Sequence, residues 1–310
     1  MVKSINLYQD FNIKKQHKGS IILIGNFDGL HLGHQKLFKL ANNYKKKYSL
    51  KIGVLTFEPM PKMYFDRNIK NFRISNKKQK IDLLKKFKVD FVIIKKFNKN
   101  FSKIKSIEFI EKILKKKLEA KFIFVSNNFR FGNKREGDVK ELIKHEKKFH
   151  YKIIKPKPLI KKRKTVSSSL IRSYLQKGKL EEVNKLLNRK WSIKGRVQRG
   201  KQLGKKIGFP TANIDIKDYV LACPGVYAVR VKMKNISKTI KGIANLGYRP
   251  TFNGKKILLE VHLFNFSGNL YNKELTVEFL KFIRKEKKFK NVDQLKKQIK
   301  NDLLVAKNTK

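Results

Sequence analysis

Two histidines stand three residues apart at the start of an expected helix, directly after a glycine-containing turn. An apolar run at Ser20–Ile24 is followed by Gly25-Asn-Phe-Asp-Gly-Leu-His-Leu-Gly-His34 and then by an amphipathic stretch to Tyr48. Such a turn lets backbone N–H groups and the helix N-terminus face an anion. In a nucleotidyl transfer, His31 and His34 would hydrogen-bond the α-phosphate oxygens and the leaving pyrophosphate. We therefore predict a phosphate site with these two catalytic donors, and with Gly25, Asn26, Phe27, Asp28 and Gly33 around the nucleotide.

The His-x-Gly-His spacing is rare by chance. With 6 His and 17 Gly in 310 residues, about 0.006 occurrences are expected before the strand–turn–helix context is required. One alternative is that the glycines only form a tight turn and that the histidines are polar surface residues. A zinc-binding pair is a second alternative, but no third ligand of suitable type is evident. Nucleotidyl transfer is the favoured interpretation.

Two later segments fit the same site. Asn127-Asn-Phe-Arg-Phe-Gly132 follows an expected strand, and Asn128 could supply a carboxamide there. Ser167-Ser-Ser-Leu-Ile-Arg172 places hydroxyls and an arginine at a helix start, where Ser168 and Arg172 could bind a triphosphate. Each segment alone is weak, because serine-rich helix caps are common.

A second phosphate site is predicted in the loop from Gly195 to Asn213. Its glycines alternate with Lys and Arg, which is typical of a flexible cationic loop for a nucleotide polyphosphate; the binding residues are expected to be Gly200, Lys205, Gly208 and Pro210. Thr211 and Asn213 face the same side of an extended segment and offer neutral oxygens to Mg²⁺, with ATP phosphates completing its octahedron. The loop is not a Walker A motif.

A kinase acting on a hydroxyl also benefits from a carboxylate that accepts the proton. Acidic residues are scarce, since Asp and Glu total 23. Glu260, inside Ile257-Leu-Leu-Glu-Val-His-Leu-Phe, and Glu278, inside Leu275-Thr-Val-Glu-Phe-Leu, are both charges within apolar strands. An outward-facing strand position explains either one equally well, and alternation alone does not choose between them.

The first half of the chain alternates short apolar runs with amphipathic stretches. The runs at Ser20–Ile24, Ile52–Phe57, Phe91–Ile94 and Phe122–Val125 predict buried strands, and His34–Tyr48 and Ser106–Leu118 predict helices. This alternation predicts an α/β, doubly wound parallel sheet with its ligand at the carboxyl ends of the strands.

The second half predicts a different fold. A short helical pair over 167–187 precedes half-buried strands at Ser192–Val197, Gly225–Met233, Thr239–Leu246, Ile257–Phe264 and Glu274–Phe282. Strands without intervening helices indicate a small antiparallel β-barrel, and an apolar stripe after Asn291 predicts a C-terminal helix. We place the domain boundary between residues 188 and 189, giving domains 1–188 and 189–310.

Composition favours a cytoplasmic enzyme. The N-terminus lacks the apolar run of a signal peptide, no apolar stretch approaches the length of a membrane span, and Cys223 is the only cysteine. The formal net charge of +54 comes from lysines spread along the whole chain together with abundant Asn, Ile and Phe. AT-rich codon usage explains this pattern better than a nucleic-acid surface, which usually clusters Lys and Arg on one element. We expect no specific nucleic-acid or membrane partner, and a monomer or weak oligomer.

Taken in order, these segments resemble the bacterial bifunctional riboflavin kinase/FAD synthetase family. Gly25–His34, Thr56–Pro61, Phe129–Gly132 and Ser167–Arg172 resemble its nucleotidyltransferase motifs. Gly208-Phe-Pro-Thr-Ala-Asn213, Pro224–Tyr227, Asn245–Thr251, Leu259–His262 and Ile283–Glu286 with Phe289 resemble its kinase motifs. The resemblance runs from about residue 20 to the C-terminus.

The resemblance implies an FMN adenylyltransferase domain followed by a riboflavin kinase barrel. The chain would phosphorylate riboflavin to FMN with MgATP and then adenylylate FMN to FAD with release of pyrophosphate. It implies His31, His34, Asn128 and Arg172 for adenylyl transfer, Thr211 and Asn213 for MgATP, and Glu260 as the base on the flavin ribityl hydroxyl. Arg284 and Phe289 would lie on a flavin-binding loop. Met60 stands where the family usually has histidine, which makes the kinase motifs the cleaner set.

Three alternatives belong to other functional classes. A class I aminoacyl-tRNA synthetase relative also uses a His-x-Gly-His-type turn, but the chain has no Lys-Met-Ser-Lys-Ser-like loop. A basic RNA-binding protein is suggested by charge alone. A remnant with a decayed adenylyltransferase half would retain only the kinase reaction.

Overall fold

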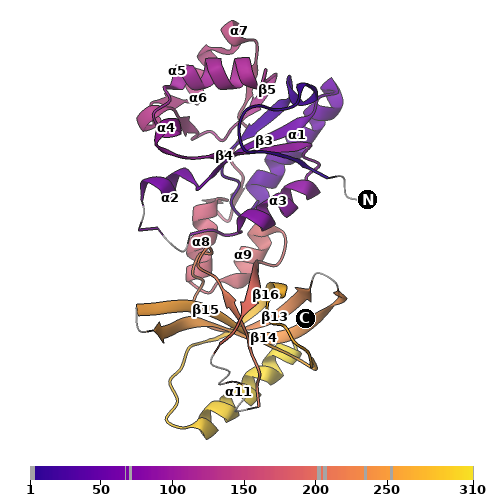
Figure 1. Cartoon of the computed structure of the whole chain (residues 1–310), viewed down its shortest axis with the longest axis vertical. Helices are drawn as coiled ribbons and strands as arrows, with labels where there is room; N and C mark the ends of the chain where they lie inside the picture. The colour runs from indigo at the N-terminus through magenta and orange to yellow at the C-terminus, as the bar shows by residue number, and fades with distance from the viewer. Residues whose placement is uncertain are drawn as a thin grey trace. The chain divides into compact units, whose positions relative to one another are not determined.

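The computed structural model describes residues 4–66, 68–69, 72–200, 204, 208–233, 236–251 and 254–309. The chain divides into two compact units, shown in Figure 1. The first comprises Met1–Ile69 and Lys77–Val166, and the second Lys70–Asn76 and Ser167–Lys310. This division groups the helical pair after Ser167 with the barrel, whereas the boundary predicted at 188/189 groups it with the sheet.

The first unit is built on a six-stranded, fully parallel sheet in the order β1-β4-β3-β2-β5-β8. Its strands are β1 (Asn6–Tyr8), β2 (Ile21–Ile24), β3 (Ile52–Glu58), β4 (Phe91–Lys96), β5 (Phe122–Phe124) and β8 (Lys152–Ile154). The four apolar runs expected to be strands are β2 to β5, so the parallel α/β prediction is confirmed. The edge strands β1 and β8 have three residues each, too few to show a pattern in the sequence.

Alternating side chains of the sheet enter two separate cores. Ile22 and Ile24 of β2 pack in one cluster with Ile110 and Leu114 of the helical stretch after Ser106. Ile21 and Leu23 pack on the opposite face with Phe38 and Ala41 of α1. Because both faces bury apolar residues, the strands appear in the sequence as continuous hydrophobic runs. The sheet is therefore doubly wound.

The helices of this unit connect the strands. They are α1 (Leu32–Tyr48), α2 (Pro61–Phe65), α3 (Lys77–Lys86), α4 (Lys99–Ser102), α5 (Ser106–Glu108), α6 (Val139–Lys144) and α7 (Glu146–Phe149). Two 3₁₀ turns, η1 (Lys15–His17) and η3 (Asn133–Arg135), and the short pairs β6 (Arg130–Phe131) with β7 (Gly137–Asp138) and β9 (Ile160–Lys161) with β10 (Lys164–Thr165), complete it. The helix expected over 106–118 continues from α5 as a π-helical segment, η2 (Phe109–Lys117), which ends with the Leu118 N–H bonded to the Ile113 carbonyl.

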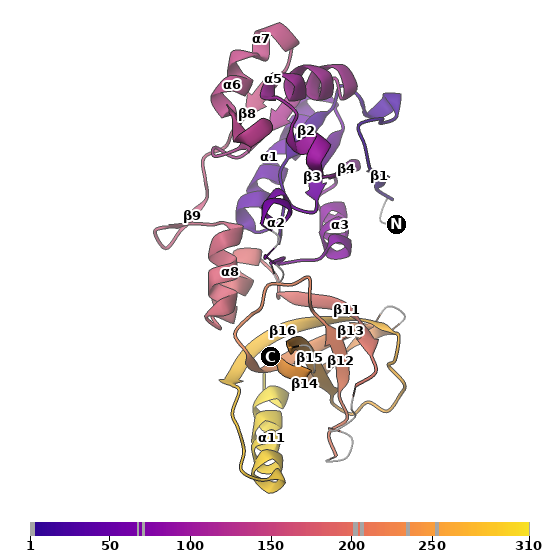
Figure 2. The ribbon, with the colours of Figure 1, turned by 60° about the vertical axis from the view of Figure 1, so that its left-hand side comes forward.

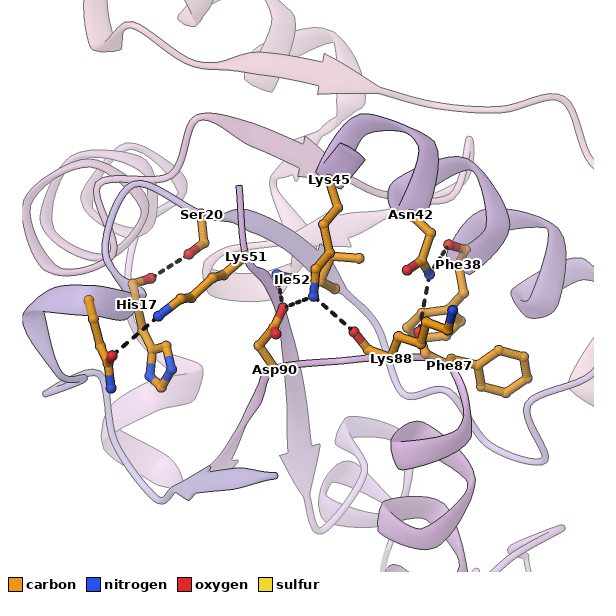
Figure 3. Close-up of polar contacts among 11 residues, drawn as sticks. His17, Ser20, Phe38, Asn42, Lys45, Lys51, Ile52, Phe87, Lys88 and Asp90 are labelled. Atoms are coloured by element: carbon orange, nitrogen blue, oxygen red, sulfur yellow. Dashed lines mark hydrogen bonds and ion pairs between the residues drawn. The ribbon is translucent and has the colours of Figure 1, made fainter. Parts of the chain in front are cut away.

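Polar side chains fasten α1 to the amino ends of the strands, on the edge away from the predicted phosphate turn. Asp90 precedes β4 and accepts a hydrogen bond from the Ile52 N–H at 2.8 Å. Its carboxylate also forms an ion pair with Lys45 at 2.6 Å (Figure 3). Asn42 of α1 donates to the carbonyls of Phe38 and Phe87 (Figure 3). These contacts fix the helix whose first turn carries the two histidines.

The second unit is a closed six-stranded antiparallel barrel in the order β11-β12-β15-β14-β13-β16, closed by pairing of β16 with β11. Its strands are β11 (Ser192–Gln198), β12 (Ala212–Asp215), β13 (Gly225–Met233), β14 (Ile236–Thr251), β15 (Gly254–Leu263) and β16 (Glu274–Lys285). Its helices are α8 (Ser168–Gln176), α9 (Leu180–Leu187) and α11 (Val292–Lys307), and α11 lies against the barrel (Figure 2). The predicted barrel with a C-terminal helix is confirmed.

Two features of the barrel differ from the sequence interpretation. The segment at 212–215, expected to be an extended part of a loop, is strand β12. Strand β16 continues to Lys285, because its ladder with β13 extends through the pair Val226↔Arg284. Arg284 is therefore a strand residue, and the expectation that it lies on a loop is wrong. No helix among the described residues is long and apolar enough to span a bilayer.

Candidate active sites

The predicted nucleotidyl-transfer turn joins β2 to α1 in the first unit. Phe27, Gly29 and Leu30 have positive φ angles of 47°, 77° and 37°, so the backbone coils tightly before the helix. Phe27 is 2% exposed and Asp28 is also 2% exposed, while Asn26 is exposed. The turn is thus held by a buried aromatic side chain while its backbone reaches the carboxyl edge of the sheet.

The two histidines stack at the start of α1. Their ring centroids are 3.7 Å apart with an angle of 19° between the planes. His31 is the N-cap residue, and its Nδ1 accepts from the backbone N–H of His34 at 3.4 Å. Since Nδ1 is an acceptor, the proton of neutral His31 lies on Nε2. Nε2–H is therefore the hydrogen-bond donor of this ring.

The second histidine is held neutral. Burial, then His31, and then the charge of Lys80 hold the pKa of His34 well below its usual value. Its Nδ1 is buried and has no hydrogen-bond partner in the described part of the chain. A buried polar atom without a partner is costly, which makes this atom a candidate contact for a ligand oxygen.

Gly33 lies against this pair. A Cβ at this position would be 3.1 Å from Nδ1 of His31 and 3.3 Å from the Val166 carbonyl oxygen. A side chain there would press on the histidine ring. At Gly25 a Cβ would be 3.3 Å from the Phe27 ring. Both glycines therefore keep the turn compact.

Asn128 follows β5, the strand beside β2, and so lies at the same carboxyl edge as the turn. It is exposed, and its Oδ1 accepts from the Ser126 hydroxyl at 2.9 Å. Met60 follows β3 at this edge, is 1% exposed and caps α2. The topology thus gathers three of the predicted segments at one edge of the sheet.

Ser168 and Arg172 belong to the second unit. Ser168 is the first residue of α8, and Ser167 is its N-cap. The Arg172 Nε donates to the Phe72 carbonyl at 2.8 Å, and its guanidinium lies 3.6 Å from the centre of the Phe72 ring. Their part in adenylyl transfer stays a prediction.

A cavity of about 910 Å³ opens in the second unit, and we call it the barrel cavity. Thr211, Asn213 and Glu260 line it together, as do Arg284 and Phe289. The resemblance to the family implied one kinase site for these five residues. They come from three separate stretches of the chain, at 211–213, 260 and 284–289.

Strand pairing explains how three polar side chains meet there. Asn213 of β12 pairs with Glu260 of β15, and Glu260 pairs with Asn245 of β14 on its other side. Paired residues of adjacent strands point to the same face of a sheet. Asn213 is 7% exposed, and its Oδ1 is buried with no hydrogen-bond partner among the described residues.

Gly200, which precedes β12 in the chain, lies against the same asparagine. A Cβ at Gly200 would come within 2.3 Å of Nδ2 of Asn213, so the glycine lets the backbone pass directly over the amide. Gly208 has φ of +91°, a left-handed conformation that glycine adopts without strain. The Pro210 carbonyl lies 2.9 Å from Nδ1 of His262, which lines the cavity. The predicted Lys205 is outside the described residues.

The two glutamates that the sequence left open occupy different surroundings. Glu278 bonds to Arg230 at 2.9 Å and to Lys232 at 2.5 Å, and it is not among the described residues that line the cavity. Burial raises its pKa, but the hydrogen bonds from Lys232 and Arg230 outweigh this and hold the pKa below its usual value. Glu260 faces the cavity instead.

Arg284 forms an ion pair with Asp302 of α11. Its Nε lies 3.0 and 2.9 Å from the two carboxylate oxygens of Asp302, and its Nη2 lies 2.7 Å from Oδ2. The Gln298 amide donates to Oδ1 at 2.9 Å. The guanidinium also lies 5.8 Å from the centre of the Phe289 ring.

Sequence reasoning missed Asp302 and Asn245. Asp302 interrupts the apolar stripe of the C-terminal helix next to Leu303. A carboxylate on the apolar face of a helix indicates a buried charge with a partner, so the sequence could have identified Asp302. It is 3% exposed. Asn245 begins the motif Asn245–Thr251, but the sequence assigns it no function. Its pairing with Glu260 is a contact between distant strands, which the sequence does not show.

Family models match both halves of the chain. A FAD synthetase model matches residues 13–170, and a riboflavin kinase model matches residues 187–310. The chain belongs to the bifunctional riboflavin kinase/FMN adenylyltransferase family. It is an enzyme with riboflavin kinase and FMN adenylyltransferase activities, and its substrates are riboflavin, FMN and ATP.

Curated relatives with that name align over nearly their whole length. The protein of Buchnera aphidicola subsp. Schizaphis graminum is 40% identical over 96% of both chains, and that of Haemophilus influenzae is also 40% identical over 96% of both. The Escherichia coli K12 protein is 36% identical over 93% of this chain and 92% of its own. A solved structure titled "Macrolide-efflux Protein" from Streptococcus pneumoniae is 29% identical, with a TM-score of 0.85 and coverage of 98% and 99%.

Proposed function

We propose that the kinase reaction takes place in the barrel cavity, with Glu260 as the general base and with Thr211 and Asn213 at MgATP. The observation that carries this assignment is the register of β12, β15 and β14, which sets Asn213, Glu260 and Asn245 side by side on the cavity wall. Gly200, Lys205, Gly208 and Pro210 belong to the loop proposed to hold the ATP phosphates.

In this reaction the riboflavin 5′-hydroxyl oxygen attacks the γ-phosphorus of ATP. The Glu260 carboxylate accepts the hydroxyl proton, and the bond from the γ-phosphorus to the bridging oxygen breaks, so that ADP leaves with the electron pair. Arg284 and Phe289 border the flavin side of the cavity. Asp302 keeps the guanidinium against that wall.

The donor set fits a magnesium ion brought in with ATP. Within the described ranges no group of three or more His, Cys, Asp or Glu side chains could hold a metal by itself. The buried Oδ1 of Asn213 and the Thr211 hydroxyl are neutral oxygen donors, and magnesium commonly takes one or two protein ligands plus substrate phosphates. The ion would neutralise charge that develops on the phosphates.

We further propose that adenylyl transfer takes place at the Gly25–His34 turn. An FMN phosphate oxygen attacks the α-phosphorus of ATP, and the bond to the bridging oxygen breaks to release pyrophosphate. Nε2–H of His31 and the ring of His34 donate to the phosphoryl oxygens as negative charge grows. Gly25, Asn26, Phe27, Asp28, Gly33, Asn128, Ser168 and Arg172 complete the proposed ATP site.

A Glu260→Gln variant tests the kinase assignment. It should lose FMN formation from riboflavin and MgATP by a factor on the order of 10²–10⁴, because the amide does not accept the proton. FAD formation from supplied FMN should persist in the same protein. Glu278→Gln is the matched control, since that carboxylate bonds to Arg230 and Lys232 instead. Full kinase activity in Glu260→Gln would refute the role of this carboxylate.

A variant with both His31→Ala and His34→Ala tests the second assignment. FAD formation from FMN should fall by a factor on the order of 10²–10³ for each lost donor, while riboflavin phosphorylation continues. His150→Asn, at an exposed histidine with a left-handed backbone, is the control. If the double variant lost both activities in a folded protein, the separation into two sites would be wrong.

The remaining proposals concern the domain bounds, the location in the cell, the oligomeric state and the partners. We propose catalytic domains at 1–188 and 189–310, a cytoplasmic enzyme, and a monomer or weak oligomer without specific nucleic-acid or membrane partners. The first is supported by the family matches at 13–170 and 187–310, which leave the helical pair between them mostly unassigned. Size-exclusion chromatography with light scattering tests the oligomeric state.

A further inference from the structure

Among the lysines that the structure describes in the first unit, Lys80 is buried, whereas most of the others are not. Lys80 of α3 is 4% exposed, while Lys77 and Lys86 at the two ends of the same helix are exposed. Removing an ammonium group from water costs several kcal/mol, so lysine is almost never fully buried without a compensating contact. Burial therefore sets Lys80 apart from the exposed lysines of the same helix.

Its ammonium group lies beside the nucleotidyl-transfer turn. Nζ of Lys80 is 3.3 Å from the Thr56 hydroxyl, and that hydroxyl is 3.4 Å from the Asn26 carbonyl of the turn. Thr56 is 1% exposed, near the carboxyl end of β3, the strand adjacent to β2. The charge of Lys80 also acts on the ring of His34. Three elements thus bring this cation to the edge where the turn lies.

The charge balance of the turn gives the cation a role. His31 uses Nδ1 as an acceptor, and His34 is held neutral, so the pair supplies hydrogen-bond donors without a net positive charge. A triphosphate and a leaving pyrophosphate carry several negative charges. A buried ammonium compensates them far better than a solvated one, because the Coulomb energy rises as the local dielectric falls.

We propose that Lys80 is a catalytic residue of FMN adenylyl transfer, donating through its ammonium group to the phosphate oxygens of ATP. It remains protonated throughout. As the FMN phosphate oxygen bonds to the α-phosphorus, the electron pair of the breaking bond moves onto pyrophosphate, and the Lys80 charge stabilises that leaving group. This inference rests on the adenylyl-transfer site proposed above.

The test is Lys80→Met, which keeps most of the side-chain volume and removes the charge. FAD formation from FMN and MgATP should fall by a factor on the order of 10²–10³ in kcat/KM. Riboflavin phosphorylation by the same chain should not change, which shows in one preparation that the enzyme is folded and active. Lys86→Met, an exposed lysine on the same helix, is the matched control and should change neither activity.

A purely structural role predicts a different result. If Lys80 only fastened α3 to Thr56, Lys80→Met would lower the unfolding temperature while the folded fraction kept its adenylyltransferase kcat. Thr56→Val separates the two roles, because it removes the hydroxyl contact and leaves the ammonium group. The proposal expects a smaller loss in Thr56→Val than in Lys80→Met, and an equal or larger loss would overturn it.

The pKa of His34 gives a further readout. Removing the Lys80 charge should raise the pKa of His34, measured by NMR titration of its ring protons, because a nearby like charge disfavours the imidazolium. Wild-type adenylyltransferase kinetics in folded Lys80→Met would refute the inference. If the variant does not fold, Lys80→Arg, which keeps the charge, must retain more FAD formation than Lys80→Gln. Equal losses in those two would also refute it.

Failure of this inference differs from failure of the site. If the double histidine variant loses FAD formation and Lys80→Met does not, only the role of Lys80 is wrong. If the double histidine variant keeps FAD formation, the whole assignment of the turn is wrong.

Discussion

The ion pair between Arg284 and Asp302 should couple the C-terminal helix to riboflavin binding. Asp302 side-chain atoms are 4% exposed and those of Arg284 are 15% exposed, so both charges are largely desolvated. The guanidinium lines the barrel cavity beside Phe289, whereas the carboxylate comes from α11. Replacing Asp302 by leucine leaves the guanidinium without its anion and free to turn away from the cavity wall.

The expected cost follows from the contacts. Breaking a buried pair by removing one partner costs about 3–5 kcal/mol. Arg284 retains a bond to the Lys285 carbonyl at 3.0 Å and can reach water through the cavity, so the lower end, about 3 kcal/mol, is the better value. The Gln298 amide also loses its acceptor. A domain of this size has a total stability of about 5–15 kcal/mol, so the variant should still fold.

The assay is a double-mutant cycle of Asp302→Leu, Arg284→Met and both together. Urea unfolding gives the stability, and steady-state kinase kinetics give KM for riboflavin and for MgATP separately. Each single change should raise KM for riboflavin about tenfold or more with less effect on KM for MgATP, and the double variant should be no worse than Arg284→Met. Free energies that add to within about 0.5 kcal/mol would refute the coupling.

Three further outcomes follow from the first unit. Gly33→Ala should lower FAD formation about tenfold and leave FMN formation unchanged, because the added methyl displaces the His31 ring. Parallel assays of both reactions measure this difference. Asp90→Ala should lower the free energy of unfolding by about 2–3 kcal/mol, and Lys45→Met by only about 0.5 kcal/mol, in urea denaturation. The pKa values of His17 and His34 are lowered in the folded state, mainly by burial. At a pH near or below the ordinary histidine pKa, the unfolded chain therefore binds more protons than the folded chain does. Stability should therefore fall as the pH drops from about 7 to about 5, and an unfolding free energy that rose over this range would contradict that reasoning.

The parts of the molecule that the sequence predicted are those fixed by local pattern. Buried parallel strands appear as continuous apolar runs because helices cover both faces, and β2 to β5 follow this rule. The Gly25–His34 turn is a contiguous segment, so its residue types and spacing could be examined directly. The edge strands β1 and β8 are too short to carry such a pattern.

The parts that it did not predict depend on contacts between distant segments. Asn213 and Glu260 are partners across a strand pair, and nothing in either segment alone specifies that register. Alternation did not choose between Glu260 and Glu278 for the same reason, since both stand in alternating strands. The resemblance to the family chose Glu260. The barrel shows that Glu260 lines the cavity and that Glu278 bonds to Arg230 and Lys232.

Charge shows this limit most clearly. Lys and Arg total 77, so no single lysine is conspicuous in the sequence, and codon bias explains the net charge of +54. Solvated lysines act on a phosphate only within a Debye length of about 8 Å and against a high dielectric. Lys80 differs because α3 and β3 take its ammonium group out of water beside the turn. Desolvation, which the sequence does not record, is what distinguishes Lys80 from the exposed lysines of the same helix.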